Sequence, residues 1–286
     1  GTLLMIERRP TLTFLTHLIL IIWLVIILFP IYIALVASTH SVRELLHAPI
    51  PIWFGHDFFH NYKLILLHGI TAAGNIPVWV MLKNSLIMAL LITVGKIVVS
   101  IIAAYAIVYF RFRFRLFFFW LIFITLMLPV QVRIVPTFQV VAQLHMINTY
   151  WGLSLPLIAS ATATFLFRQF FRTIPNELMD AARIDGAGPL RFFKDVILPL
   201  SRTNIAALFI IMFIYGWNQY LWPLVATTSG QMNTVVMGMK QLANVADQIP
   251  QWNYILATAI LAMLPPVLII IIMQKLFVKG LIESEK

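Results

Sequence analysis

The sequence predicts an all-α integral membrane protein with six transmembrane helices. Three observations lead to this class. The chain of 286 residues is 61% hydrophobic and has a mean hydropathy of +0.94. Only 10% of its residues are charged, against about 25% in an average soluble domain. Its apolar residues gather into runs of about 20 or more, the length of helix that crosses a bilayer core of about 30 Å.

Six segments meet this length criterion, and each is expected to form one span. They are residues 12–37, 81–110, 116–134, 151–171, 204–227 and 254–278. The first is longer than the apolar core of an ordinary signal peptide, so we interpret it as a retained anchor. Prolines within or beside the runs are expected to kink the helices, because neighbouring helices satisfy the freed carbonyls.

The basic residues predict the orientation, because Lys and Arg are enriched in cytoplasmic loops. An N-terminus in the cytoplasm places 14 of them on the cytoplasmic side and four outside, while Lys83 and Lys96 lie in the second span. The cytoplasmic set is Arg8, Arg9, Arg111, Arg113, Arg115, Arg168, Arg172, Arg183, Arg191, Lys194, Arg202, Lys275, Lys279 and Lys286, and the outer set is Arg43, Lys63, Arg133 and Lys240. Both termini are therefore expected in the cytoplasm.

The expected organisation is a single membrane domain at residues 12–278, with a cytoplasmic loop at 172–203. Residues 1–11 form a cytoplasmic N-terminus, and residues 279–286 form a cytoplasmic tail. Residues 1–4 precede the first methionine, and we interpret them as a cloning remnant.

The two long outer segments, 38–80 and 228–253, are expected to be extracytoplasmic loops. The first holds five of the seven histidines: His40, His47, His56, His60 and His68. A metal site is one interpretation, but the spacings match no tight ligand set and the chain has no cysteine. We therefore favour an ordinary polar loop.

The stretch 177–199, ELMDAARIDGAGPLRFFKDVILP, is polar although it lies between two apolar runs. Pro175 suits the start of a helix, and Gly186 predicts its end, because glycine readily takes the left-handed C-terminal conformation. A second helix is expected to begin at Pro189 and to end before Pro199. The sequence thus predicts two short helices that meet at a glycine corner.

The second of these helices is expected to be amphipathic, with Leu190, Phe193 and Ile197 on one apolar stripe. Two interpretations follow, and the residues alone favour neither. The helix pair is either an interfacial cap on the bundle or a docking element for a cytoplasmic partner.

The stretch DAARIDG at 180–186, followed after nine residues by VILP at 196–199, resembles the EAA motif of ABC importer permeases. Asp180 stands where the motif has Glu, and Val196 where it has Ile. The AAYA at 103–106, followed by Arg111, resembles the end of the second span in sugar-type members. Several stretches most resemble the branch that serves sn-glycerol-3-phosphate import: Arg133-Ile134 and residues 160–171, 181–187, 215–224 and 280–286.

The resemblance implies a type I ABC importer permease fold and a loop that couples the spans to an ATPase. The residues that it assigns to this contact are Glu177, Asp180, Ala181, Ala182, Asp185 and Gly186. In such a contact Asp180 or Asp185 pairs with a basic residue of the ATPase, and Gly186 forms the corner.

The resemblance also implies partners and a location. The partners are a second, different permease subunit, two ATPase subunits and an extracytoplasmic substrate-binding protein, with no nucleic acid. The chain is expected to span a bacterial inner membrane several times. The implied substrate is sn-glycerol-3-phosphate or a related glycerophosphodiester, and the alternative is a sugar or another polyol.

We expect the chain to be a transport subunit without enzymatic activity. A P-loop needs the pattern G-x-x-x-x-G-K-[ST] to hold phosphates, and Gly95-Lys96 lacks both the upstream glycine and the hydroxyl residue. No cofactor or metal is expected in this chain. ATP and Mg²⁺ are expected on the partner ATPase.

Polar residues within the spans are functional candidates, because burying them in lipid is costly. Lys96 either reaches toward an interface or a kink, or offers positive charge to an anionic substrate. Trp217 fits an aromatic belt, whereas the amides beside it need partners in lipid. The residues expected to line a translocation path are Lys96, Arg133, Tyr215, Trp217, Asn218 and Gln219.

Two other functional classes fit the sequence less well. A secondary transporter or channel needs acidic coupling residues within its spans, and all ten Asp and Glu lie outside the six segments. A membrane enzyme needs a nucleophile with its base, or a metal cluster, and the sequence shows neither pattern.

Overall fold

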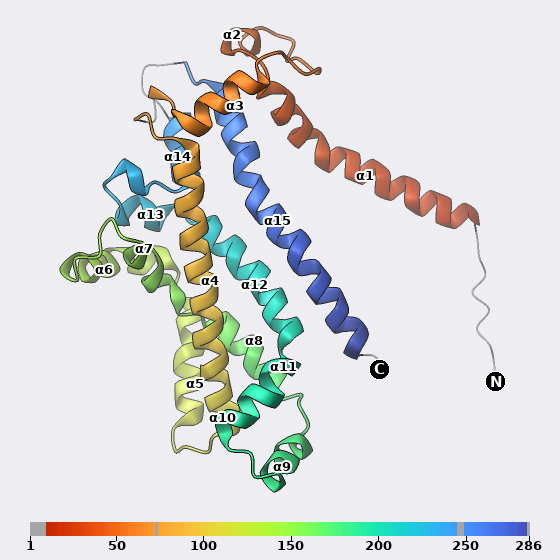
Figure 1. Ribbon diagram of the computed structural model, residues 1–286, viewed down its shortest axis with the longest axis vertical. Coiled ribbons are helices and arrows are strands. Elements are labelled where there is room, and N and C mark those ends of the chain that lie inside the picture. Colours follow the sequence, from red (N-terminus) through yellow and green to blue (C-terminus); the bar gives the residue numbers. More distant parts are fainter. Residues whose placement is uncertain (1–9, 72–73, 245–248, 285–286) are drawn as a thin grey trace.

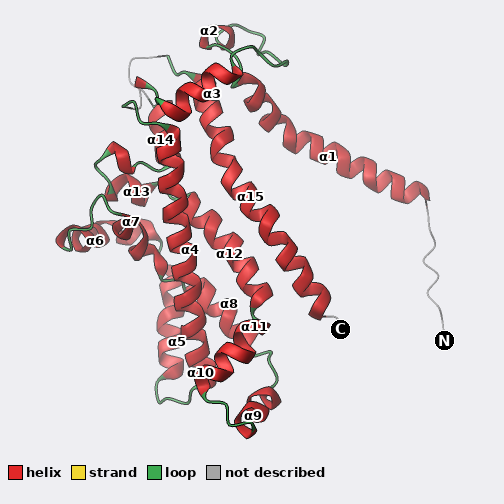
Figure 2. Ribbon diagram, in the orientation of Figure 1, coloured by secondary structure: helices red, strands yellow, loops and turns green. Residues whose placement is uncertain are grey.

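The computed structural model describes residues 10–71, 74–244 and 249–284. Within these ranges the regular structure is entirely helical (Figure 2). The expected cloning remnant at residues 1–4 and all but the last two residues of the expected N-terminal segment lie outside the described residues. The expected C-terminal tail continues the last helix as far as Ser284.

Three helices are each long and apolar enough to cross a membrane: α1 (Pro10–Ala37), α4 (Val78–Tyr109) and α15 (Trp252–Ser284). Two further spans are made of bent pairs. Helices α7 (Tyr150–Ile158) and α8 (Ala161–Phe171) meet at 47°, and the segment Pro189–Leu200 meets α12 (Arg202–Trp217) at 71°. The described residues thus provide three continuous spans, or five if each bent pair counts as one.

The single helix expected over 116–134 is not formed, and this is a correction. The chain instead forms α5 (Arg115–Ile124), a 3₁₀ turn at η2 (Thr125–Met127) and α6 (Val130–Gln143). Pro129 explains the break, because it has no backbone N–H to continue the helical ladder and it disfavours a helical residue before it. The ten residues of α5 extend about 15 Å, which is half of a bilayer core.

The segment expected at 204–227 is also interrupted. Helix α12 ends at Trp217, residues 218–220 form a break, and α13 (Leu221–Ala226) follows. The amides of Asn218 and Gln219 therefore lie at the end of a helix and not within one. This break places polar groups near the middle of the molecule (Figure 1).

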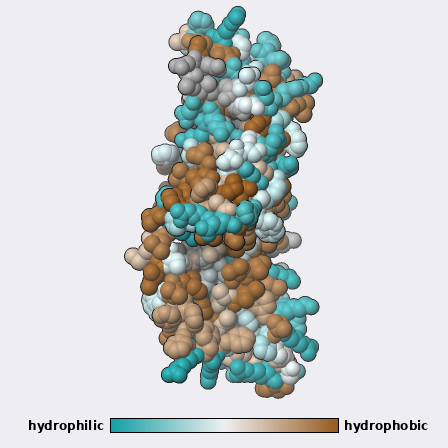
Figure 3. Space-filling model, turned by 90° about the vertical axis from the view of Figure 1, so that its left-hand side faces the viewer, coloured by the Kyte–Doolittle hydropathy of each residue, from teal (hydrophilic) through white to brown (hydrophobic). Residues whose placement is uncertain are grey.

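Helix α4 is the centre of the bundle, and α12, α8 and α7 all pack against it (Figure 1). Its side chains join most of the core, including Ile92 and Ala104, which are fully buried. Gly216 allows α12 to approach closely, because a Cβ there would stand 3.0 Å from the Ala89 Cα. Figure 3 shows the resulting surface from the left of Figure 1, with hydrophilic atoms at both ends and in a band near the middle, and with apolar surface mainly in the lower half.

The C-terminal part of α1 packs against α15, whereas the N-terminal part of α1 extends away from the bundle (Figure 1). Its side chains from residue 11 to residue 30 are all exposed. An apolar helix of this kind is compatible only with lipid or with another membrane protein as its surroundings.

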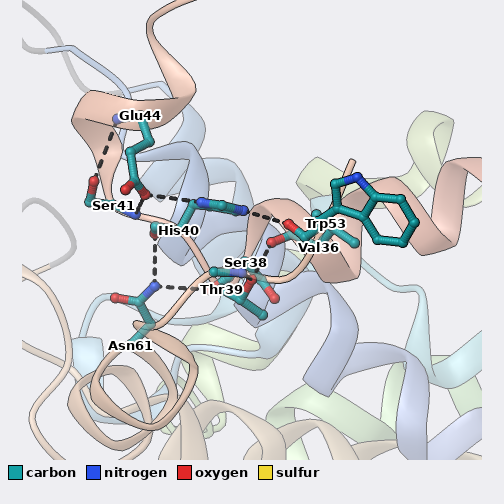
Figure 4. A network of polar contacts seen from close by, with 9 residues as sticks. Val36, Ser38, Thr39, His40, Ser41, Glu44, Trp53 and Asn61 are labelled. Atoms are coloured by element: carbon teal, nitrogen blue, oxygen red, sulfur yellow. Dashed lines mark hydrogen bonds and ion pairs between the residues drawn. The ribbon is translucent and has the colours of Figure 1, made fainter. Parts of the chain in front are cut away.

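The end of the molecule that lies opposite α9 is formed by four short elements. They are α2 (Val42–Leu45), α3 (Phe58–Leu67), η4 (Gly230–Met232) and α14 (Val235–Ala243). Figure 4 shows the polar contacts that hold its first loop. The Asn61 Nδ2 donates to the carbonyls of Ser38 and His40, at 2.9 and 3.0 Å. His40 contacts the Glu44 carboxylate at 3.0 Å and the Trp53 carbonyl at 2.8 Å.

Glu44 belongs to a capping box at the start of α2, where Ser41 and Glu44 each bond the other's backbone N–H. The bond from the Ser41 backbone N–H, followed by the contact with His40, holds the pKa of the Glu44 carboxyl below its usual range. His40 therefore has a structural role in this loop. Among the described residues no three His, Cys, Asp or Glu side chains are placed to hold a metal ion.

Candidate functional site

The glycine corner joins α9 (Asn176–Ile184) to α10 (Pro189–Phe192) at one end of the molecule (Figure 1). Gly186 has φ +72°, in the left-handed region, and the amide of Ala187 donates to the Ala182 carbonyl at 2.8 Å. The expected helix end at Asp185-Gly186 and the expected start at Pro189 are both confirmed. Local sequence was sufficient here, because glycine and proline each fix a backbone conformation.

The sequence predicts that the second helix ends before Pro199. In the structure the helix continues past this residue, which is a correction. After α10 the chain widens into a π-helical turn, η3 (Phe193–Ile197), and continues as α11 (Leu198–Leu200). The amide of Leu198 donates to the Phe193 carbonyl five residues earlier. This wider turn shifts the carbonyls relative to Pro199, so that the proline ring is accommodated where a regular α-helix would be broken.

The π-turn also changes which residues of this helix are buried. Ile197 is fully buried and Phe193 half-buried, as expected of the apolar stripe, but Leu190 is 84% exposed. Phe192, outside the predicted stripe, is buried in its place. The expected stripe of Leu190, Phe193 and Ile197 is therefore corrected to one that begins at Phe192.

The tip of the corner is apolar although it is exposed. Ile184 is 87% exposed, on the other side of the corner from Leu190, and no residue of α9 is buried. A Cβ added at Gly186 would meet no atom within 4 Å. Exposed apolar side chains at a protruding end mark a contact surface more often than a cap on the protein's own bundle.

The acidic residues of the corner differ in their pairing. Asp180 lies 3.5 Å from Arg183 on the same helix, and both side chains are 64% exposed. Glu177 and Asp185 have no ion pair with any described residue. Ala181 is exposed, whereas Ala182 is half-buried against the bundle.

Aromatic side chains fasten this corner to α4. The Tyr105 hydroxyl donates to the Pro189 carbonyl at 2.8 Å, and its ring lies 4.9 Å from that of Phe193. The Tyr109 ring lies 5.4 Å from that of Phe192. The sequence reasoning missed this attachment. The tyrosine within AAYA, in the last turns of the second expected span, was the available signal.

A central cavity of about 790 Å³ opens where α4, α6, α8 and the end of α12 meet. Five of the six residues expected to line a translocation path do line it: Lys96, Arg133, Tyr215, Asn218 and Gln219. Trp217 does not, because it points away from the cavity, is 3% exposed and stacks on Phe213 at 5.7 Å. Two residues along the helix, about half a turn, thus separate a cavity residue from a packing residue.

Lys96 is the buried charge of this cavity. Its side chain is 6% exposed, and the Nζ lies 4.3 Å from the centre of the Tyr215 ring. Arg133 lies near enough to repel it. Neither residue has an acidic partner among the described residues, so the two positive charges are available to an anion.

The break after α12 supplies polar groups to the same cavity. The Gln219 Nε2 donates to the Tyr215 carbonyl at 3.1 Å, which satisfies one carbonyl at the helix end. The Asn218 amide is exposed and forms no side-chain hydrogen bond within the described residues. Gln131 and Ser160 also line the cavity and were missed, since only the tertiary fold brings their elements together.

A family model described as "Binding-protein-dependent transport system inner membrane component" matches residues 96–283 of this chain. This match includes the glycine corner and every residue that lines the central cavity. It leaves out α1, α2 and α3.

Curated relatives extend the likeness to the whole chain. The sn-glycerol-3-phosphate transport system permease protein UgpE of Brucella melitensis is 54% identical over 282 residues, covering 99% of this chain and 100% of the relative. The protein of the same name from Pectobacterium atrosepticum is 55% identical over 284 residues, with the same coverage.

A solved structure has the same fold. It is a chain of a bacterial ABC transporter involved in the import of the acidic polysaccharide alginate, with a TM-score of 0.77. The match covers 96% of this chain and 99% of the other, at 20% sequence identity. At this identity the likeness concerns the fold alone.

Proposed function

The chain belongs to the family of binding-protein-dependent transport system inner membrane components, and from this premise we propose that it forms half of the translocation path of an importer for sn-glycerol-3-phosphate. Its family and its several apolar helices make it a multi-pass membrane protein. Its role is transport, and ATP is hydrolysed on other subunits of the importer.

The central cavity carries the substrate proposal. Lys96 and Arg133 supply two positive charges that no described acid neutralises. A phosphate monoester is a compact anion that such a pair binds well, whereas a neutral sugar or polyol gains nothing from it. Asn218 adds a free amide for the hydroxyl groups of a glycerol moiety. A related glycerophosphodiester shares this chemistry, and the names of the relatives agree with it.

The glycine corner is proposed as the contact with the ATPase. Ile184 and Leu190 would enter an apolar groove on that partner, with Gly186 between them. Asp185 is the better candidate to pair with a basic residue of the ATPase, because Asp180 already has Arg183 beside it. Glu177, Ala181 and Ala182 complete this surface. The docking interpretation is thereby favoured over the cap.

The proposed topology has six spans, with α5 and α6 together serving as the third and both termini in the cytoplasm. The proposed location is a bacterial inner membrane, and the fold is that of a type I importer permease. A second, different permease subunit is proposed beside α1, whose apolar surface is uncovered. Two ATPase subunits bind ATP and Mg²⁺, and an extracytoplasmic binding protein meets the outer loops, especially 228–253.

The test is the purified, reconstituted importer with its binding protein. We expect sn-glycerol-3-phosphate to stimulate the ATPase rate and to be taken up only when ATP is present. Glycerol and a neutral sugar serve as matched ligands without phosphate, and stimulation by these alone would favour the alternative substrates. Uptake by this chain alone, driven by an ion gradient, would contradict the importer itself.

The ATPase contact is tested by Gly186→Asp, with Gly188→Asp as its control. Both substitutions add a carboxylate in open space, but only Gly186 has a positive φ. We expect Gly186→Asp to lower ATP-driven uptake by at least about tenfold, because an unpaired charge buried in an interface costs about 3–5 kcal/mol. Gly188→Asp is expected to have a smaller effect. Wild-type assembly and uptake in Gly186→Asp would refute the contact.

A further inference from the structure

A second cavity, of about 670 Å³, lies where the end of α4, the start of α5, α9 and α10 meet. We call it the basic groove. It is distinct from the central cavity, because the two share no lining residue. Four arginines line it: Arg111, Arg115, Arg172 and Arg183.

The positive charge of the groove is not neutralised within the described part of the chain. Arg183 has Asp180 at 3.5 Å, but Arg111, Arg115 and Arg172 form no ion pair there. Arg115 and Arg172 also lie close enough to Arg168 to repel it. Like charges held together destabilise a fold unless an anion binds between them. The planar guanidinium is the side chain best suited to hold a phosphate through two parallel hydrogen bonds.

The walls of the groove are apolar and aromatic. They include Val108, Phe171, Ile174, Met179 and Phe192. The two tyrosine hydroxyls of the groove are already engaged, since Tyr105 donates to the Pro189 carbonyl and Tyr109 to the Phe171 carbonyl at 3.4 Å. The groove therefore combines positively charged arginine side chains with an apolar wall. This combination fits a ligand with an anionic head and an apolar body better than it fits a small soluble anion.

We expect the groove to lie at the depth of lipid headgroups, because α4 is longer than a hydrocarbon core. Helix α4 has 32 residues and extends about 48 Å, which exceeds a hydrocarbon core of about 30 Å. The arginines that follow its end cannot lie in hydrocarbon without a large cost. Phe110, Phe114 and Phe117 are exposed beside them. Figure 3 shows the same order, with apolar surface in the lower half and hydrophilic atoms at the lower tip.

We propose that the basic groove binds the phosphate headgroup of an anionic phospholipid from the cytoplasmic leaflet, with Arg115 and Arg172 as its main contacts. Basic pockets between transmembrane helices on the cytoplasmic side are a recurrent form of lipid recognition. The bound lipid would join α4 and α5 to α9 and α10, and would thus steady the corner against the membrane. The inference rests on the orientation given under the proposed function, and not on the substrate.

The test uses the complete importer in nanodiscs of phosphatidylcholine, with and without phosphatidylglycerol. Native mass spectrometry measures how much phosphatidylglycerol stays bound, and the ATPase rate is measured in parallel. The test variant is Arg115→Gln/Arg172→Gln. The control is Arg113→Gln/Arg202→Gln, which removes the same charge from two exposed arginines that do not line the groove.

We expect the control to retain phosphatidylglycerol like the wild type. The test variant should bind it about 30-fold more weakly, because each arginine contributes about 1 kcal/mol at an anionic surface. The lipid should raise the ATPase rate of the wild type and of the control, and not that of the test variant. Equal retention by all three proteins would overturn the proposal.

Two further outcomes would also overturn it. If inorganic phosphate in phosphatidylcholine nanodiscs reproduces the stimulation, the groove binds a soluble anion. If the test variant loses its ATPase subunits in both lipids, the arginines contact that partner. Failure of the proposed function would look different, because the wild type itself would then show no ATP-driven uptake while its lipid retention could still be measured.

Discussion

The central cavity and the basic groove are both cationic, both lined by aromatic rings and both built against α4, but they hold their charge differently. In the central cavity Lys96 is 6% exposed and lies under the Tyr215 ring. In the groove Arg111 and Arg172 are exposed, and the tyrosines hold the backbone of neighbouring elements. A buried charge of fixed position selects a ligand, whereas exposed charges at a membrane surface add small and graded attractions.

The largest expected effect of a single substitution is that of Lys96→Met. It removes the buried charge of the central cavity and nearly preserves the volume. We expect uptake of sn-glycerol-3-phosphate to fall about 100-fold, because losing one partner of a buried charged contact costs about 2–5 kcal/mol. The measurement is uptake by proteoliposomes that contain the full importer.

Lys83→Met is the matched control for this variant. Lys83 lies on the same helix and also over an aromatic ring, with its Nζ 5.3 Å from the Trp79 centroid, but it is exposed and lines neither cavity. It should transport like the wild type. If the two lysine variants behave alike, the contrast between buried and exposed charge has no functional meaning here.

A smaller effect is expected for Tyr215→Leu, which removes the ring above Lys96. A cation–π contact contributes about 0.5–2 kcal/mol, so uptake should fall between about 2-fold and 30-fold. Tyr215→Phe keeps the ring and should be close to wild type. A loss in Tyr215→Phe as large as in Tyr215→Leu would show that the hydroxyl, and not the ring, is what matters in the cavity.

The smallest expected effect belongs to the wall of the groove. Tyr105→Phe keeps the ring but leaves the Pro189 carbonyl without its bond, which costs about 1 kcal/mol. We expect the number of molecules transported per ATP hydrolysed to fall by no more than about fivefold. Tyr109→Phe removes a longer bond, of 3.4 Å, and should have less effect. A larger loss in Tyr109→Phe than in Tyr105→Phe would show that Tyr109, and not Tyr105, attaches the corner to α4.

The glycine corner shows how far local sequence reaches. The positive φ of Gly186 and the start of α10 at Pro189 follow from the residues themselves, because each restricts the backbone wherever it stands. The EAA-like spacing located the same loop by resemblance. The exposure of Leu190 did not follow, since the π-turn after it depends on how Phe192 and Ile197 fit the bundle.

The sequence by itself determined that this chain is a membrane protein. It also determined the positions of most of its long helices and of the glycine corner, because composition and backbone restriction act residue by residue. Only the tertiary structure decided that Arg133 lies beside Lys96, and that Tyr215 faces a cavity while Trp217 faces the core. The reason is physical. Almost every face of these helices is apolar, so hydropathy carries no signal for which face meets a neighbour, and packing alone makes that choice.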